Sequence, residues 1–252
     1  MRLFSYNILN GGVGRADPIG EVIEAQHADV VVLIEADDAW VVERIAKRLR
    51  MDYVIAPGDG HAAAVLSRFP IGHSLNRAML DSAGPRSWLE VSIEPPHAPP
   101  LNVMAIHLHP RATLADEARR TDQLNRVLAV TEVWRDRQVP HVLAGDFNAN
   151  APGQKIAIDR CKRSTRAAFA ENGQTLPRDA VRLLLDHGYV DTLHAVRQEA
   201  ALETATFTTH EPGQRVDYVF THGLGVHDAW VETDRLATYA SDHYPVGAEL
   251  RR

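Results

Sequence analysis

The chain of 252 residues contains a single cysteine, Cys161, and only 6% aromatic residues. One cysteine cannot form an intramolecular disulfide, so the signature of an oxidising compartment is missing. No apolar run approaches the roughly 20 residues that a membrane-spanning helix needs. The amino-terminal segment lacks the long apolar stretch and the small-residue cleavage site of a secretory signal. We therefore expect a cytoplasmic protein without a membrane span.

The sequence also has fewer basic than acidic residues: 27 Lys and Arg and 33 Asp and Glu, which gives a formal net charge of −6. Proteins that wrap duplex nucleic acid usually have a strongly basic surface, so this balance argues against such a protein. An enzyme that meets a polyanion only locally is still allowed. With no repeat and no long linker, the sequence predicts one catalytic domain over residues 1–252, which we expect to be monomeric.

Runs rich in Val, Ile, Leu and aromatic residues predict strands, several of them apolar on both faces as in a covered sheet. The predicted strands are residues 3–8, 30–35, 53–56, 63–67, 88–93, 101–109, 141–146, 204–208, 216–220, 229–232 and 244–250. Helical patterns cover residues 19–27, 37–49, 114–134, 154–169 and 178–187. Two β-sheets with helices outside them would satisfy this order of elements.

Four of the apolar strands end on residues that can take part in chemistry, namely Asn7, Glu35, His107 and Asp146. Ligands of open α/β sheets bind outside such strand ends. Period-two alternation places His107 and His109 on one face, and likewise Asp146 and Asn148. A single acid at a strand end is usually only the start of a loop. Four such ends, together with Asp242 near the carboxyl terminus, predict a functional site.

These residues belong to short segments that read, in chain order, Tyr6-Asn7-Ile8, Leu33-Ile34-Glu35, Leu66-Ser67-Arg68-Phe69-Pro70, Ile106-His107-Leu108, Gly145-Asp146-Phe147-Asn148, Arg215-Val216-Asp217-Tyr218 and Ser241-Asp242-His243. In order and spacing they resemble the motif set of the endonuclease/exonuclease/phosphatase superfamily. That superfamily includes abasic-site endonucleases, pancreatic-type DNA nucleases, sphingomyelinases and inositol-polyphosphate phosphatases. The resemblance extends from residue 3 to residue 250. It implies an α/β (α+β) fold, a four-layer sandwich of two face-to-face mixed β-sheets flanked by helices on both outer sides.

The resemblance implies that Glu35 and Asp242 are metal-binding carboxylates, with Asn7 as a neighbouring amide. Hard oxygen ligands on few protein groups suit Mg²⁺ or Mn²⁺. The plainer reading of Glu35 is an acid at the start of a helix. Abasic-site endonucleases carry an acid two residues after the first asparagine, where this sequence has Leu9. The number of metal ions, one or two, is therefore open.

The same resemblance implies that His243 and Asp217 form an acid-oriented histidine, in which the carboxylate fixes the tautomer and favours the imidazolium. Superfamily mechanisms differ over whether this histidine is the general base or holds the phosphate, and we expect the base role. Asp146 and Asn148 match the pair that aligns the attacking water and grips a phosphate oxygen. An Asp-Xaa-Asn turn would use the same two residues. His107 matches a histidine that contacts the phosphate.

Several residues have weaker assignments. Ser67 and Arg68 are expected to shape the wall of the site and to contact substrate. His109 is expected beside the substrate; with His107 it would instead form a His-Xaa-His zinc site, for which no third nitrogen or sulfur ligand is evident. The remaining histidines that we expect to be ordinary surface or core residues are His61, His73, His97, His141 and His194.

A locally basic strip follows the Asp-Phe-Asn segment, made of Lys155, Arg160, Lys162, Arg163 and Arg166. On a single helix most of these side chains would share one face. The plain interpretation is a solvated helix face. The functional one is that this strip, with Arg163 and Arg166 as the residues to test, offsets an otherwise acidic surface and holds a second phosphate of an extended substrate, such as a nucleic-acid strand or a polyphosphorylated small molecule.

Together these observations predict a divalent-metal-dependent hydrolase that cleaves a phosphoester by in-line attack of an activated water. A phosphodiesterase or nuclease fits better than a monoesterase, with nucleic acid or a polyphosphorylated small molecule as the substrate. The alternatives are a phospholipid or inositol-phosphate phosphatase of the same fold, a non-catalytic module that binds a phosphate ligand, and a zinc hydrolase.

Overall fold

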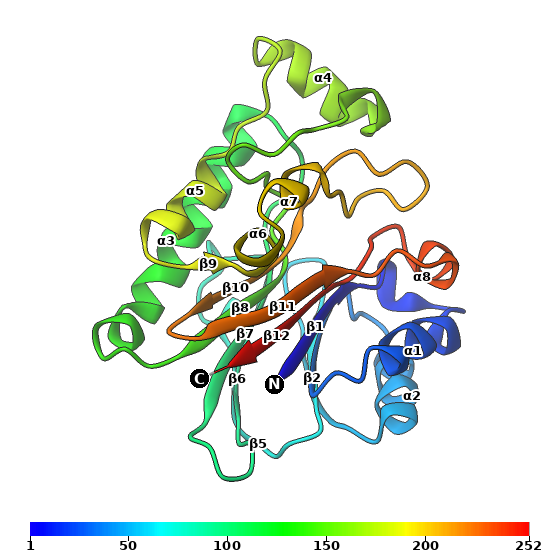
Figure 1. The fold of residues 1–252 in the computed structure, drawn as a ribbon, viewed down its shortest axis with the longest axis vertical. Coiled ribbons are helices and arrows are strands. Elements are labelled where there is room, and N and C mark those ends of the chain that lie inside the picture. The colour runs from blue at the N-terminus through cyan, green and yellow to red at the C-terminus, as the bar shows by residue number, and fades with distance from the viewer. Residues whose placement is uncertain (252) are drawn as a thin grey trace.

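The computed structural model describes residues 1–251 and contains two mixed β-sheets of six strands each (Figure 1). Sheet A contains, in spatial order, β11 (Gly225–Val231), β12 (Val246–Arg251), β1 (Arg2–Asn7), β2 (Val30–Ile34), β4 (Ala63–Ser67) and β3 (Asp52–Ala56). Sheet B contains β5 (Ile71–Asn76), β6 (Ser87–Ile93), β7 (Leu101–His107), β8 (His141–Asp146), β10 (Asp217–His222) and β9 (Val190–Asp191). Each sheet combines parallel and antiparallel neighbours.

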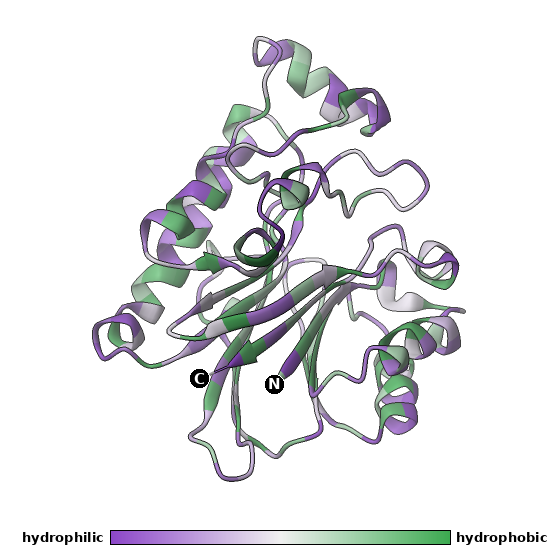
Figure 2. Ribbon diagram, in the orientation of Figure 1, coloured by the Kyte–Doolittle hydropathy of each residue, from purple (hydrophilic) through white to green (hydrophobic). Residues whose placement is uncertain are grey.

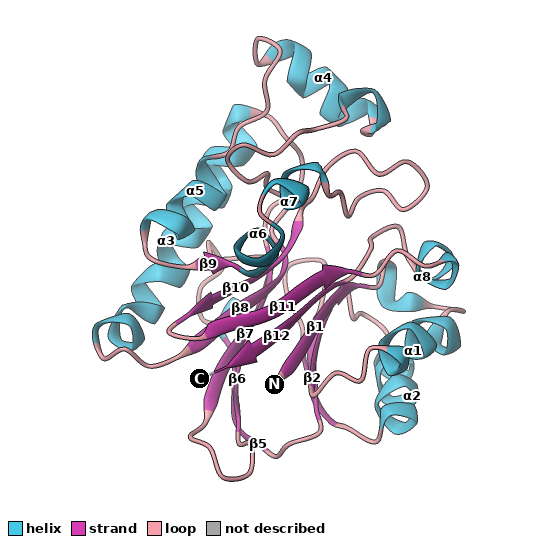
Figure 3. Cartoon of the chain, in the orientation of Figure 1, coloured by secondary structure: helices cyan, strands magenta, loops and turns pink. Residues whose placement is uncertain are grey.

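Helices lie on the two outer sides of this pair of sheets (Figure 3). Sheet A is covered by α1 (Ala16–Ala25), α2 (Ala39–Leu49) and α8 (Arg235–Ala240), and sheet B by α3 (Leu114–Asp136) and α5 (Asp179–Asp186). The shorter elements are α4 (Arg163–Glu171), α6 (Thr192–Arg197), α7 (Glu199–Glu203) and the 3-10 turns η1 (Asn10–Gly12), η2 (Arg77–Met79) and η3 (Ile158–Arg160). This layering confirms the predicted four-layer sandwich.

Alternation along the strands creates three apolar layers. In β2, Val30, Val32 and Ile34 pack in the layer between the two sheets, while Val31 and Leu33 pack against α1 and α2. Every residue of β2 is buried, which is why both of its faces are apolar. Figure 2 shows hydrophobic residues along the strands of both sheets.

The strands that end in polar residues meet at one edge of the sandwich. The parallel strands β1 and β2 end side by side, so Glu35 follows next to Asn7. In sheet B, the parallel strands β7 and β8 pair His107 with Asp146. Because β10 is antiparallel to β8, its first residue, Asp217, also pairs with Asp146. The strand registers alone therefore line up three of the predicted site residues across sheet B.

Two predicted elements are wrong. Residues 204–208 form no strand; Phe207 makes only isolated bridges, to Gln214 and His243. Residues 154–169 are not one helix, because the backbone N–H groups of Lys155 and Ala157 donate to Leu202 and Gly213 instead of to a helical turn. The chain there forms η3 and α4 separately.

Within residues 1–251, no helix has the length and hydrophobicity needed to cross a membrane. The single catalytic domain, the monomeric state and the cytoplasmic location stay predictions.

Candidate active site

Asn7 joins the polar edges of the two sheets. Its amide nitrogen donates to Oε1 of Glu35 at 3.2 Å and to Oδ2 of Asp146 at 3.1 Å. Its amide oxygen accepts from the backbone N–H of Leu9 at 3.0 Å, which fixes the orientation of the amide. Asn7 is only 1% exposed. One buried amide therefore holds a carboxylate of each sheet within hydrogen-bond distance of the same nitrogen.

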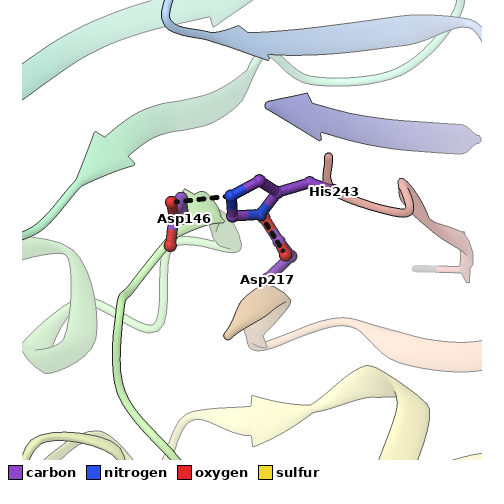
Figure 4. Close-up of side chains that lie close together, drawn as sticks. All are labelled: Asp146, Asp217 and His243. Carbon is purple, nitrogen blue, oxygen red and sulfur yellow. Dashed lines mark hydrogen bonds and ion pairs between the residues drawn. The ribbon is translucent and has the colours of Figure 1, made fainter. Parts of the chain in front are cut away.

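His243 is oriented by Asp217, as expected for this pair. Its Nδ1 donates to Oδ2 of Asp217 at 2.9 Å, and its Nε2 faces Oδ2 of Asp146 at 3.8 Å (Figure 4). All three side chains are almost fully buried. Burial lowers the pKa of His243, but the charges of Asp217 and Asp146 outweigh it and raise that pKa to about 10. The imidazole is therefore an imidazolium at neutral pH.

Asp146 stands at the centre of the group, at the end of β8. Gly145 precedes it with a φ of 145°, and a Cβ at that position would lie 2.0 Å from the carbonyl oxygen of Ile106. Only glycine allows this close approach of β8 to β7. Burial raises the pKa of the Asp146 carboxyl, His243 lowers it and Asp217 raises it again, to about 7. Burial therefore favours the protonated form of this carboxyl more than in an exposed aspartate.

His107 packs against Asp146 at the end of β7. Its Nε2 lies 3.6 Å from Oδ2 of Asp146, and its side chain is 2% exposed. Burial lowers the pKa of His107 well below its usual value, and the charge of Arg86 lowers it further. The Nδ1 atom is buried without a hydrogen-bond partner within residues 1–251. His107 is therefore a neutral imidazole with one unused ring nitrogen.

Asn148 forms the Asp-Xaa-Asn turn that was the purely structural interpretation of this residue. Its φ is 48°, a left-handed conformation that asparagine tolerates well. Its backbone N–H donates to Oδ1 of Asp146 at 2.9 Å, and its side-chain nitrogen donates to the carbonyl oxygen of Leu108 at 3.1 Å. These bonds hold the Asp146 carboxyl in place, while a contact between Asn148 and a phosphate stays a prediction.

Glu35 and Asp242 offer carboxylate oxygens to a cation. Oε2 of Glu35 accepts from the backbone N–H of Asn10 at 2.8 Å, which fixes that carboxylate beside Asn7. Oδ1 of Asp242 lies 3.9 Å from Nε2 of His243 and is buried without a hydrogen-bond partner within residues 1–251. A buried carboxylate oxygen is costly unless it is paired or binds a cation. The oxygen donors therefore fit the Mg²⁺ or Mn²⁺ that the sequence implied.

A second arrangement of possible ligands overlaps this one. Single atoms of Asp146, Asp217 and His243 all lie within 4.8 Å of one another. In this trio, however, the imidazolium of His243 already neutralises Asp217 through their hydrogen bond, and a cation would have to displace that proton. Metal binding by Glu35 and Asp242 stays a prediction.

One site residue was missed by the sequence analysis, namely His61. Its Nδ1 donates to Oδ2 of Asp37 at 2.8 Å and lies 3.8 Å from Oε2 of Glu35. Its ring centroid lies 5.7 Å from that of His107. The start of β4 pairs with the end of β2, so the residues just before β4 come to lie beside Glu35. No feature of the local sequence reports that strand register.

The expected position of Ser67 and Arg68 is wrong. Because β4 runs antiparallel to β2, the end of β4 lies beside Val30, at the start of β2 and far from Glu35. Arg68 donates there to the carbonyl oxygen of Ala28 at 2.8 Å. These two residues therefore close the opposite edge of sheet A.

His109 and the two arginines bond to groups outside the group around Asp146. Nε2 of His109 bonds to Oδ1 of Asp116 at 2.9 Å, at the start of α3, which occupies that ring nitrogen. Arg163 and Arg166 are exposed on α4, and Arg166 donates to the carbonyl oxygen of Asp159 at 3.2 Å. Their contact with substrate stays a prediction.

The fold and this edge define a class of protein in which two covered sheets present acids, amides and histidines along one edge. The chain belongs to the Endonuclease/Exonuclease/phosphatase family, whose model matches residues 4–243. Enzymes of this family hydrolyse phosphoester bonds and depend on divalent metal ions.

The individual proteins that this chain resembles match only part of its length or share little of its sequence. The chain is 34% identical over 148 residues to the Escherichia coli K12 protein named Uncharacterized protein YbhP, a match that spans 56% of this chain and about half, 55%, of that protein. An endonuclease/exonuclease/phosphatase from Beutenbergia cavernae has a TM-score of 0.72 at 22% identity, covering 100% of this chain and 71% of its own.

Two further solved structures share the fold over nearly the whole of both chains. The 3′ phosphatase NExo from Neisseria, bound to a product DNA hairpin, has a TM-score of 0.72 at 20% identity and covers 100% of each chain. An AP endonuclease from Archaeoglobus fulgidus has a TM-score of 0.70 at 17% identity and covers 99% of this chain and 98% of its own.

Proposed function

We propose that this protein is a divalent-metal-dependent phosphodiesterase or nuclease. The observation that carries the proposal is the bridge made by Asn7, whose amide nitrogen donates to both Glu35, the expected metal ligand, and Asp146, to which we assign the proton transfer. A metal-dependent phosphoesterase of this kind needs a metal ligand and a proton acceptor beside the same phosphate. Here the two groups come from different sheets. The similarity to NExo and to an AP endonuclease supports nucleic acid as the first substrate to test.

Glu35 and Asp242 would hold the cation, with Asn7 beside them. A bound Mg²⁺ or Mn²⁺ supplies charge that polarises the phosphate oxygens and stabilises the transition state.

Asp146 and His243 take the proton-handling roles. The oxygen of a water molecule forms the new P–O bond as the ester P–O bond breaks, and the water proton passes to Asp146, whose pKa of about 7 suits a general base. The departing ester oxygen keeps the electron pair of the broken bond and takes a proton from solvent. Although burial lowers the pKa of His243, the charges of Asp217 and Asp146 raise it and favour the imidazolium, so we assign to His243 a hydrogen bond to a phosphate oxygen. This assignment exchanges the roles of His243 and Asp146 that the sequence led us to expect.

The test is hydrolysis of a substrate panel with Mg²⁺ or Mn²⁺. The panel contains abasic, nicked and 3′-phosphorylated DNA, RNA, nucleotide esters, phosphoinositides, sphingomyelin and bis-p-nitrophenyl phosphate. We expect activity on a nucleic-acid ester that is abolished in Asp146→Asn and unchanged in Asp186→Asn. The second variant is the matched control, because it removes an exposed acid at the far end of α5.

Two outcomes would contradict the proposal. Full turnover in Asp146→Asn would show that the site lies elsewhere. Binding of phosphate esters without hydrolysis of any panel member would favour a non-catalytic module.

A further inference from the structure

Lys162, a member of the basic strip, lies beside Asp242. Its Nζ lies 3.5 Å from Oδ2 of Asp242, and its side chain is 51% exposed. The same Nζ lies 4.1 Å from the centre of the Phe207 ring. That ring is 4.5 Å from the imidazole of His243. Lys162 therefore reaches the site from outside, in contact with an aromatic ring that touches His243.

The segment that carries Lys162 is fastened to the site. The backbone N–H of Ala157 donates to the carbonyl oxygen of Gly213 at 2.9 Å. Cys161 packs against Gly213, so closely that a Cβ there would lie 2.8 Å from its Sγ. The hairpin around Gly213 contains Phe207, which bridges to His243. An exposed ion pair by itself contributes little to fixing a side chain. The position of Lys162 is also fixed by the contacts of Ala157 and Cys161 in the same segment.

The two oxygens of Asp242 have different surroundings. Oδ2 faces the ammonium of Lys162, whereas Oδ1 is buried without a hydrogen-bond partner within residues 1–251. One oxygen is thus neutralised by a side chain, and the other is available to a metal ion. A carboxylate whose charge is partly neutralised attracts an additional divalent cation less strongly.

The loop after β1 holds no acid that could bind a second metal ion. Arg15 donates to the backbone carbonyl oxygens of Leu9 and Ala240, which ties this loop to the segment that leads to Asp242. Leu9 stands where the abasic-site endonucleases carry an acid, and its side chain offers no ligand. This position therefore lacks the carboxylate that a second metal ion would need.

We propose that Lys162 takes the place of a second metal ion: the site binds one divalent cation, and the ammonium of Lys162 supplies the second positive charge to the substrate phosphate. This inference rests on the proposed function and deepens it. In the substrate complex the ammonium moves from Oδ2 of Asp242 onto a non-bridging phosphate oxygen, while Phe207 keeps it over the site.

The first experiment needs no substrate. Mn²⁺ binding to the metal-free protein is measured by calorimetry, with the free ion followed by electron paramagnetic resonance. Wild type should bind one Mn²⁺. Lys162→Met should bind Mn²⁺ about tenfold more tightly, because a positive charge next to Asp242 is lost. Lys162→Arg should keep the wild-type affinity.

The matched control is Lys47→Met. Lys47 is an exposed lysine on α2 that pairs with Glu43 at 2.7 Å, outside the basic strip. Its loss should leave Mn²⁺ affinity unchanged. On the best panel substrate, Lys162→Met should lower kcat/KM by about 10²-fold, and Lys47→Met should not change it.

The outcomes separate this inference from the proposed function. Two tightly bound ions in wild type, or equal Mn²⁺ affinity in wild type and Lys162→Met, would overturn the role of Lys162 and leave the phosphoesterase intact. A wild-type protein that binds no divalent cation would overturn both.

Discussion

The buried pair of Asp217 and His243 makes a prediction about stability that does not depend on any substrate. Asp217→Asn preserves the size of the side chain but removes the charge that holds His243 as an imidazolium. The rise of the His243 pKa from 6.5 to about 10 corresponds to roughly 5 kcal/mol, at about 1.36 kcal/mol per pKa unit. Asp146 supplies part of that effect, so we expect Asp217→Asn to cost about 3–5 kcal/mol at pH 6, as for loss of one partner in a buried ion pair.

The pH dependence follows from the direction of this shift. A histidine whose pKa is raised by folding contributes its full stabilisation below its unfolded value of 6.5, and loses it as the pH rises through about 10. The difference in free energy of unfolding between wild type and Asp217→Asn should therefore shrink from pH 6 to pH 10. Urea unfolding in the presence of a chelator, at several pH values across this range, measures that difference.

A second buried pair provides the control. Asp191 accepts from Arg215 through two bonds, at 2.9 and 2.6 Å, and both side chains are buried. Because a guanidinium does not titrate in this range, the destabilisation by Asp191→Asn should be the same at pH 6 and pH 10. Parallel behaviour of the Asp217 and Asp191 variants would refute the imidazolium assignment.

The remaining predictions concern activity. His243→Ala and Asp217→Asn should each lower turnover by about 10²–10⁴-fold, and the double variant should be little worse than His243→Ala, whereas multiplicative losses would show that the two residues act independently. Chelation should abolish activity, and added Mg²⁺ or Mn²⁺ should restore it. Glu35→Gln should raise the metal concentration needed for activity before it lowers turnover at saturating metal. Full activity in excess chelator would contradict this. Neutralising Arg163 and Arg166 should weaken binding of an extended substrate and reduce the salt slope of binding by roughly 0.7–0.9 per lost phosphate contact, while turnover of a small diester stays unchanged. Equal affinity and equal salt slope in variant and wild type would show that these arginines do not contact the substrate.

Local patterns in the sequence were sufficient for the layers and for much of the site. The apolar runs of β1, β2, β7 and β8 predict buried strands, because a strand covered on both faces needs apolar side chains at every position. The same runs end at Asn7, Glu35, His107 and Asp146, and strand ends are where a parallel sheet exposes polar side chains. The resemblance to a family added Asp217, Asp242 and His243, which no periodicity could have grouped.

Failures of prediction came from contacts between segments that are distant along the chain. Residues 204–208 have the composition of a strand, yet Phe207 forms only isolated β-bridges, and its ring packs on His243. Lys155 and Ala157 lie in a helical pattern, but their N–H groups bond to the chain near residues 202 and 213. Backbone groups pair with whatever partner the tertiary fold presents, and propensity is overridden there.

What the sequence by itself determined is therefore most of the strands, without β5 and β9, the acids and amides at their ends, and the family. Only the tertiary structure decided on which edge each residue lies. Antiparallel pairing carries Ser67 to the edge opposite the site and brings His61 onto it. The docking of residues 157–161 on the hairpin of Phe207 places Lys162 against Asp242. Strand register and docking depend on interactions summed over the whole core, so no local segment of the sequence contains them.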